Sequence, residues 1–166
     1  MTKILKYSTI AEIEHQVKDI NQTKIYTLNN IHELQKDSSI IVRRRVLGRN
    51  NKPYYRLENT LTIELSDKSH IFIDEGFIWD LSSVPRFLWW LLPPDGDFEL
   101  ASLIHDFLYI HRKKLGYSRK FADKEMLIWS KAVNGTKNKI SIRNLDNQVR
   151  YIAVRLFGWI VWNKRK

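Results

Sequence analysis

The stretch that decides the fold is ELASLIHDFLYI, residues 99–110. A helix turns by about 100° per residue, so this stretch carries one broad apolar stripe along a helix, made of Leu100, Ala101, Ile104, Phe107 and Leu108. Leu103 and Ile110 lie on the opposite side, which makes the helix apolar nearly all round. Helices of this kind are buried in a protein core. We therefore expect the rest of the chain to be arranged around residues 99–110.

Two neighbouring polar residues, His105 and Asp106, interrupt this apolar helix. A buried imidazole or carboxylate without polar partners costs several kcal/mol of folding free energy. We therefore expect both side chains to be inaccessible to solvent and to have partners, with Asp80 close to at least one of them.

The segments on either side predict an α+β fold. After residue 82 the sequence indicates three more helices, over residues 84–92, over residues 119–134 with Ser118 as the N-cap, and from residue 142 or 145 to 162. Before residue 82 it indicates one helix over residues 9–20 and then strands over residues 25–28, 39–47, 54–65, 70–74 and 76–79. We expect a small antiparallel sheet in the N-terminal half, packed against a C-terminal bundle of about four helices, as a single domain over residues 1–166.

The composition restricts the chemistry and the partners. The chain has no cysteine, which excludes disulfides, thiolate nucleophiles and zinc-thiolate sites. Its formal net charge of +10 favours an anionic partner, such as a nucleotide, nucleic acid, anionic lipid or an acidic protein, although the charge also serves solubility. No signal peptide is recognisable, and no apolar run reaches the roughly 20 residues that cross a bilayer.

Four sequence blocks occur in order along the second half of the chain. They are G-F-x-x-D-x-x-S-x-P-R at residues 76–86, H-D-x-L-Y at residues 105–109, S-R-x-x-A-D at residues 118–123 and A-V-R-x-F-G at residues 153–158. With these blocks the chain resembles a family of uncharacterised proteins, a domain of unknown function found often in bacteriophages and prophages. The resemblance covers about residues 72–162 and leaves residues 1–70 outside. It implies a phage-encoded protein located in the host cytoplasm or in the virion.

One interpretation of these blocks is a metal-dependent hydrolase acting on a phosphate-containing substrate. Imidazole nitrogens and carboxylate oxygens bind divalent cations and help activate water, so the candidate catalytic residues are Asp80, His105, Asp106 and Asp123, of which the last three are the candidate ligands of a divalent metal. Arginines bind phosphate well, so the candidate substrate-binding residues are Arg86 and Arg119, together with Tyr109 and Ser83.

The alternative interpretation is a buried structural network in a non-enzymatic phage protein. Asp80, followed by Ser82, Ser83 and Pro85, is typical of a helix N-terminus, and Arg119 lies one helical turn from Asp123. Such a protein would be a virion component, or a binder or inhibitor of host defence components or nucleotides. Both interpretations are open at the level of the sequence.

The last helix carries an unusual concentration of aromatic residues. Trp159 and Trp162 flank Ile160 and Val161, and the cationic residues Lys164-Arg165-Lys166 follow. We expect a core helix with a cationic C-terminal end. Binding at a membrane interface is the alternative that this pattern allows.

Overall fold

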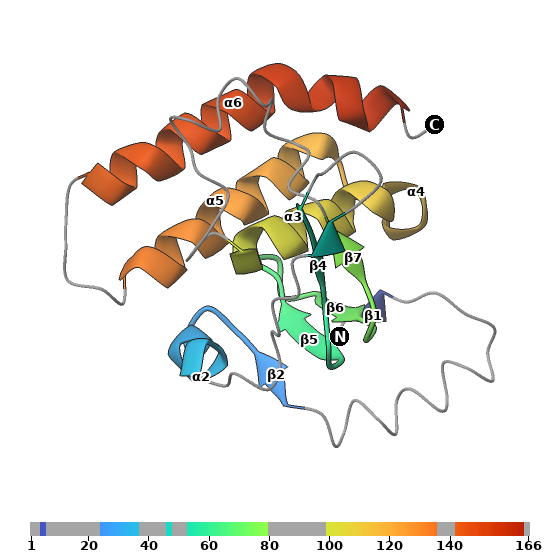
Figure 1. Ribbon diagram of the computed structural model, residues 1–166, viewed down its shortest axis with the longest axis vertical. Coiled ribbons are helices and arrows are strands. Elements are labelled where there is room, and N and C mark those ends of the chain that lie inside the picture. The colour runs from blue at the N-terminus through green and yellow to red at the C-terminus, as the bar shows by residue number, and fades with distance from the viewer. Residues whose placement is uncertain are drawn as a thin grey trace. The chain divides into compact units, whose positions relative to one another are not determined.

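The computed structural model describes residues 4–5, 24–36, 46–47, 53–79, 99–135 and 142–164 (Figure 1). The predicted α+β class is confirmed, with short strands in the first half and helices that dominate the second. The chain divides into two compact units, one formed by Met1–Val46 with Tyr55–Ile78 and the other by Leu47–Tyr54 with Trp79–Lys166. The expectation of a single domain stays a prediction.

The first unit contains a four-stranded sheet with the strand order β1-β6-β5-β2. Its strands are β1 (Ile4–Leu5), β2 (Ile25–Tyr26), β5 (Leu61–Glu64) and β6 (His70–Ile73). The central pair β5 and β6 is antiparallel, whereas β1 pairs with β6 and β2 pairs with β5 in parallel. The sheet is therefore mixed, and only its centre is antiparallel as expected. A tight turn at residues 66–68 joins β5 to β6. The outer strands enter from distant parts of the chain, and such connections permit parallel pairing.

The alternating pattern over residues 54–65 sets the buried face of this region. Five apolar residues of the same parity are all at most 4% exposed, namely Tyr55, Leu57, Leu61, Ile63 and Leu65. The single strand expected over residues 54–65 is divided into β4 (Pro53–Arg56) and β5 with a bend between them. The short helix α2 (Ile31–Lys36) adds Ile31 and Leu34 to the buried residues.

A second sheet has three strands in the order β3-β4-β7. Its outer strands are β3 (Val46–Leu47) and β7 (Ile78–Trp79). The turn before β7 includes Gly76 at a φ of +82°, a conformation that glycine adopts without a steric cost.

The second unit is helical, with α3 (Glu99–Ile110), α4 (Arg112–Leu115), α5 (Arg119–Gly135) and α6 (Ile142–Lys164). Helix α5 packs against both α3 and α6, as Figure 1 shows. All residues from Glu99 to Tyr109 are buried, so α3 is the central helix that its composition predicts. Helix α5 also buries an apolar stripe, which consists of Ala122, Met126, Trp129 and Val133.

Helix boundaries follow local signals in this unit. The Ser118 hydroxyl accepts the backbone N–H of Phe121 at 3.2 Å, which is the predicted N-cap of α5. Gly116 ends α4 with a φ of +71°, the left-handed conformation common after a helix C-terminus. The predicted helices over residues 9–20 and 84–92 lie outside the described residues.

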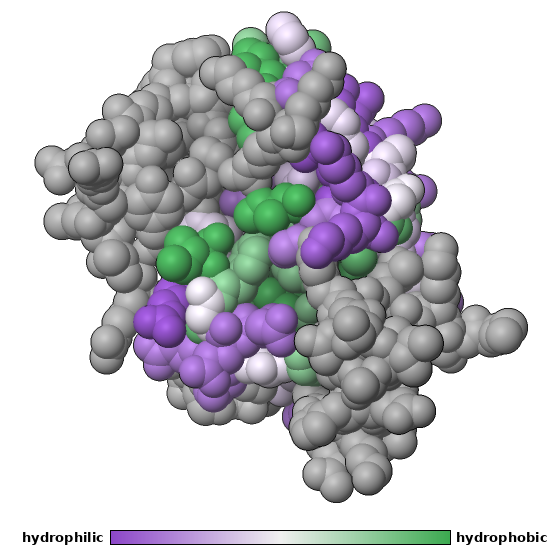
Figure 2. Space-filling view, turned by 90° about the vertical axis from the view of Figure 1, so that its right-hand side faces the viewer, coloured by the Kyte–Doolittle hydropathy of each residue, from purple (hydrophilic) through white to green (hydrophobic). Residues whose placement is uncertain are grey.

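The outermost helix of this unit, α6, is only partly a core helix. Ala153 and Val154 are buried, whereas Trp159 is 54% exposed. At the top of Figure 2, the level that α6 occupies in Figure 1, hydrophobic surface lies open beside hydrophilic surface. Among the described residues, no helix has the length and apolar character needed to cross a membrane.

Candidate functional site

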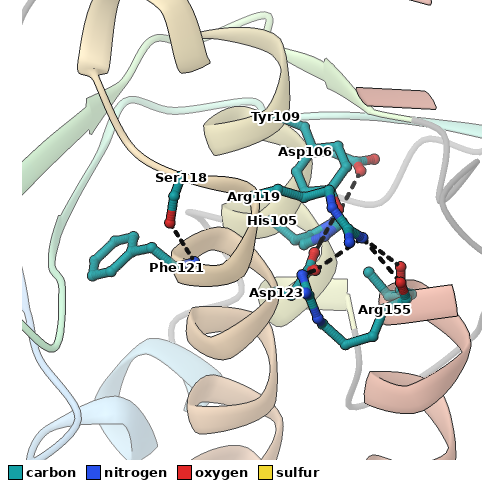
Figure 3. Close-up of polar contacts among 9 residues, drawn as sticks. His105, Asp106, Tyr109, Ser118, Arg119, Phe121, Asp123 and Arg155 are labelled. Atoms are coloured by element: carbon teal, nitrogen blue, oxygen red, sulfur yellow. Dashed lines mark hydrogen bonds and ion pairs between the residues drawn. The ribbon is translucent and has the colours of Figure 1, made fainter. Parts of the chain in front are cut away.

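Three helices of the second unit bring polar side chains together around Asp123 (Figure 3). Helix α3 supplies His105 and Tyr109, which lie one turn apart and therefore on the same face. Helix α5 supplies Asp123 and, one turn earlier, Arg119. Helix α6 supplies Arg155. We call these five residues the Asp123 cluster.

Both oxygens of the Asp123 carboxylate are occupied. Oδ1 accepts the Tyr109 hydroxyl at 2.5 Å and lies 3.1 Å from His105 Nε2. Oδ2 accepts Nη1 of Arg155 at 2.7 Å and Nη1 of Arg119 at 3.5 Å. The Asp123 side chain is 0% exposed, so these four donors replace the water that an isolated carboxylate would need.

His105 lies between two carboxylates. Its Nε2 faces Asp123, and its Nδ1 is 3.5 Å from Oδ1 of Asp106. Burial by itself lowers the pKa of His105, but the two carboxylates outweigh burial and raise this pKa above its ordinary value. The predicted inaccessibility of His105 and Asp106 is confirmed, at 1% and 3% exposure.

The same contacts shift the pKa values of Asp123 and Tyr109. Burial raises the pKa of Asp123, but the hydrogen bonds from His105 and Tyr109 lower it more, so the net shift is downward. Burial and the adjacent Asp123 charge both raise the pKa of Tyr109. These shifts favour an aspartate anion beside a protonated His105 and the arginines, and Tyr109 keeps its proton as a donor.

Helix α6 approaches this cluster closely because of Gly158. A Cβ atom at Gly158 would lie 2.7 Å from the Tyr109 hydroxyl and 3.6 Å from Nη1 of Arg119. Nη1 of Arg119 also donates to the backbone oxygens of Val154 and Arg155, at 3.4 and 3.1 Å. The A-V-R-x-F-G block thus supplies a cation, two acceptors and the space that the Tyr109 hydroxyl needs.

Further contacts continue the packing between α3, α4 and α6. The Tyr109 ring meets the Trp162 ring edge-on, with centroids 4.9 Å apart. The Arg112 guanidinium lies over the same Trp162 ring at 5.0 Å. On α5, the buried Glu125 carboxylate accepts the indole N–H of Trp129 at 3.2 Å.

The structure brings together five of the eight residues proposed from the sequence, His105, Asp106, Tyr109, Arg119 and Asp123. The other three, Asp80, Ser83 and Arg86, lie outside the described residues. Sequence reasoning missed Arg155 and Gly158. A signal for Arg155 was present, because it is a charged residue within an apolar and aromatic stretch of helix. No local pattern indicated which residue would lie so close to Gly158 that a side chain there has no room.

The described residues do not form an open metal site. Within them, no three His, Asp or Glu side chains are grouped so that they could hold a metal ion. His105 turns one ring nitrogen toward each carboxylate, and Asp123 already receives four donors. This arrangement is suited to holding three helices together.

The fold and the cluster define a class of protein: an α+β chain whose helical unit is joined by a buried carboxylate with imidazole, phenol and guanidinium partners. Residues 55–154 match the family described as "Protein of unknown function (DUF1353)", and the chain belongs to this family. The match begins before the first of the four blocks and ends within the last one. No curated protein and no solved structure matches the chain.

Proposed function

We propose that this chain is a phage- or prophage-encoded binding protein that acts without catalysis and holds an anionic partner against its helical unit. The proposal rests on the sorting of charge in this unit. In residues 99–133 and 147–163 all four acidic side chains are buried, namely Glu99, Asp106, Asp123 and Glu125. Every exposed charged side chain in the same ranges is a lysine, namely Lys113, Lys114, Lys120, Lys124 and Lys131.

This sorting gives the described exterior of the unit a single sign of charge. Charges of one sign attract an oppositely charged partner over roughly a Debye length, about 8–10 Å at moderate salt. The net charge of +10 adds to this attraction over the whole chain. A partner that presents phosphates or carboxylates is therefore favoured, as the composition also indicates.

The occupied geometry of the Asp123 cluster supports a role without catalysis. A general base needs a ring nitrogen or a carboxylate oxygen within reach of a substrate proton. Both ring nitrogens of His105 face carboxylates, and Asp123 is 0% exposed. The phage origin rests on the four sequence blocks, and with it the expected location in the host cytoplasm or virion.

Binding to an immobilised polyanion such as heparin tests this proposal. The full chain should elute only at raised salt, and Lys113→Glu with Lys114→Glu should elute much earlier. The control, Lys68→Glu with Lys24→Glu, makes the same charge change with exposed lysines of the first unit. Similar losses in both double variants would show a net-charge effect alone, and would contradict a surface on the helical unit.

A metal-dependent hydrolase of a phosphate-containing substrate is the second candidate. The observation that favours it is the convergence of His105, Asp106 and Asp123 in one buried cluster. Its divalent metal would require these side chains to exchange their present partners for the ion. Asp80, Ser83 and Arg86 belong to this candidate site in the sequence and keep their predicted roles as hypotheses.

A further inference from the structure

Helix α6 has an apolar stripe on its outward side. Four large side chains of this helix are exposed, Ile152 at 53%, Leu156 at 60%, Trp159 at 54% and Ile160 at 38%. Their spacing of four, three and one residues places them on one side of the helix, over about 12 Å of its length. We call these four residues the outer stripe.

The opposite side of α6 makes the contacts that hold the helix in place. Val154 and Gly158 are buried there, and Arg155, which lies at the edge, binds Asp123. The outer stripe therefore contributes nothing to the contacts of the Asp123 cluster. Contiguous exposed apolar residues bordered by polar ones are typical of surfaces that bind a partner.

The charge of the helical unit indicates what this partner is. Helix α6 ends at Lys164, which Arg165-Lys166 follow in the sequence, and every exposed charged side chain in residues 99–133 and 147–163 is a lysine of α4 or α5. An apolar stripe with a tryptophan, on a helix that ends in cations, is the combination that lies in the interface of anionic membranes. A lipid surface accepts the apolar side chains and supplies the negative charge at the same time.

A second copy of the chain fits this surface less well. Each copy carries a net charge of +10, so pairing two outer stripes would bring like charges together. A stable interface also buries about 800 Å² on each partner, and four partly exposed side chains on two turns supply only a fraction of this area.

We propose that the outer stripe of α6 docks onto an anionic lipid surface, with the apolar side chains entering the headgroup region and the exposed lysines of the helical unit attracted to lipid phosphates. This inference rests on the proposed function, since it names the anionic partner of the helical unit. It concerns binding to a surface and requires no segment that spans the bilayer.

Co-sedimentation of the full chain with vesicles tests the proposal. The chain should bind vesicles in which about a third of the lipid is phosphatidylglycerol, and should bind pure phosphatidylcholine vesicles at least about tenfold more weakly. Ile152→Ser with Leu156→Ser should weaken binding to the anionic vesicles by about tenfold or more, because it removes half of the outer stripe. Ile78→Ser is the matched control, because Ile78 is 56% exposed and lies outside α6; it should change binding less than about twofold.

Three outcomes would overturn the docking proposal. One is the absence of binding to anionic vesicles, and another is an equal loss in the Ile78→Ser control. The third is a dimer in solution that the Ile152→Ser, Leu156→Ser double variant abolishes, since the stripe would then be covered by a second copy. If the chain is retained on heparin but does not bind vesicles, the proposed binding of an anionic partner is supported and a lipid surface as that partner is contradicted.

Discussion

A single carboxylate, that of Asp123, joins side chains from three helices. It is 0% exposed and lies within 3.5 Å of nitrogen or oxygen atoms of His105, Tyr109, Arg119 and Arg155. Removing one partner of a buried ion pair is far more costly than replacing the whole pair by apolar groups, because the remaining charge loses its compensation. At the scale of single residues, the free energy of unfolding therefore depends most strongly on Asp123.

Asp123→Asn should destabilise the fold by about 3–5 kcal/mol, because it removes one of the two carboxylates at His105 and leaves Arg155 without its counter-charge. The measurement is the free energy of unfolding from urea denaturation. Lys124→Gln changes an exposed neighbour on the same helix and should stay within about 0.5 kcal/mol of the parent. A loss below about 1 kcal/mol for Asp123→Asn would show that the cluster does not hold the helices together.

His105 and His111 should have opposite effects on how the free energy of unfolding changes with pH. The pKa of His105 is raised, so its contribution is complete below the unfolded pKa of about 6.5 and is lost as pH rises through the folded pKa. Burial, and secondarily Lys114, lowers the pKa of His111 to about 4. Its contribution is therefore complete above about 6.5 and is lost as pH falls toward 4.

Urea unfolding over a range of pH checks this pair of signs. His105→Gln should flatten the alkaline side of the stability profile, and His111→Gln should flatten the acidic side. The slope from each histidine is at most about 1.4 kcal/mol per pH unit, which corresponds to one proton. An unchanged alkaline side in His105→Gln would contradict the raised pKa.

At the scale of the elements, the contact of α6 with α3 depends on Gly158. Because a Cβ there would lie 2.7 Å from the Tyr109 hydroxyl, a larger residue forces the Tyr109 side chain or one of the two helices to move. Helix α5 makes its own contacts with both of them, so a shift of α6 also strains Arg119, which donates to the backbone of α6. The packing of α3, α5 and α6 therefore depends on the contacts of Gly158, Tyr109 and Arg119.

Gly158→Ala should cost about 1–3 kcal/mol of unfolding free energy, the range for overpacking in a close-packed interior. Tyr109→Phe removes the hydroxyl that the new methyl group would meet. The cost of Gly158→Ala should therefore be smaller in the Tyr109→Phe background than in the parent, as measured by a double-mutant cycle. If Gly158→Ala lowers the free energy of unfolding equally in both backgrounds, its clash is not with the Tyr109 hydroxyl.

At the scale of the whole molecule, the two proposed functions differ in their response to metal. A ligand that binds only the folded state raises the melting temperature by mass action. A binding protein with a structural Asp123 cluster should show no rise with millimolar Mg²⁺, Mn²⁺ or Zn²⁺ in a thermal-shift experiment. A clear rise that His105→Ala or Asp123→Ala abolishes would favour the hydrolase instead.

Much of the fold could be predicted from local patterns. The apolar character of residues 99–110 identified the central helix, and Ser118 marked the start of the next long helix. The alternation of apolar residues along 54–65 is a local signal of the same kind, because its apolar members are the buried ones. These signals are readable because periodicity and capping depend on neighbours within a few residues. The direction of the outer strands was not predictable, since parallel pairing depends on how distant segments meet.

The sequence by itself determined that His105 and Asp106 are buried and need polar partners, because a helix that is apolar nearly all round has no place on the surface. Only the tertiary structure decided that Asp123 is the partner of His105 on another helix. It placed Arg155 on Asp123 across 32 residues of chain, and the Tyr109 hydroxyl where a side chain at residue 158 would be. It also left the outer stripe of α6 exposed, although its apolar residues predicted a core position. The physical reason is that periodicity defines the faces of a helix, whereas the packing of the other helices decides which face they cover.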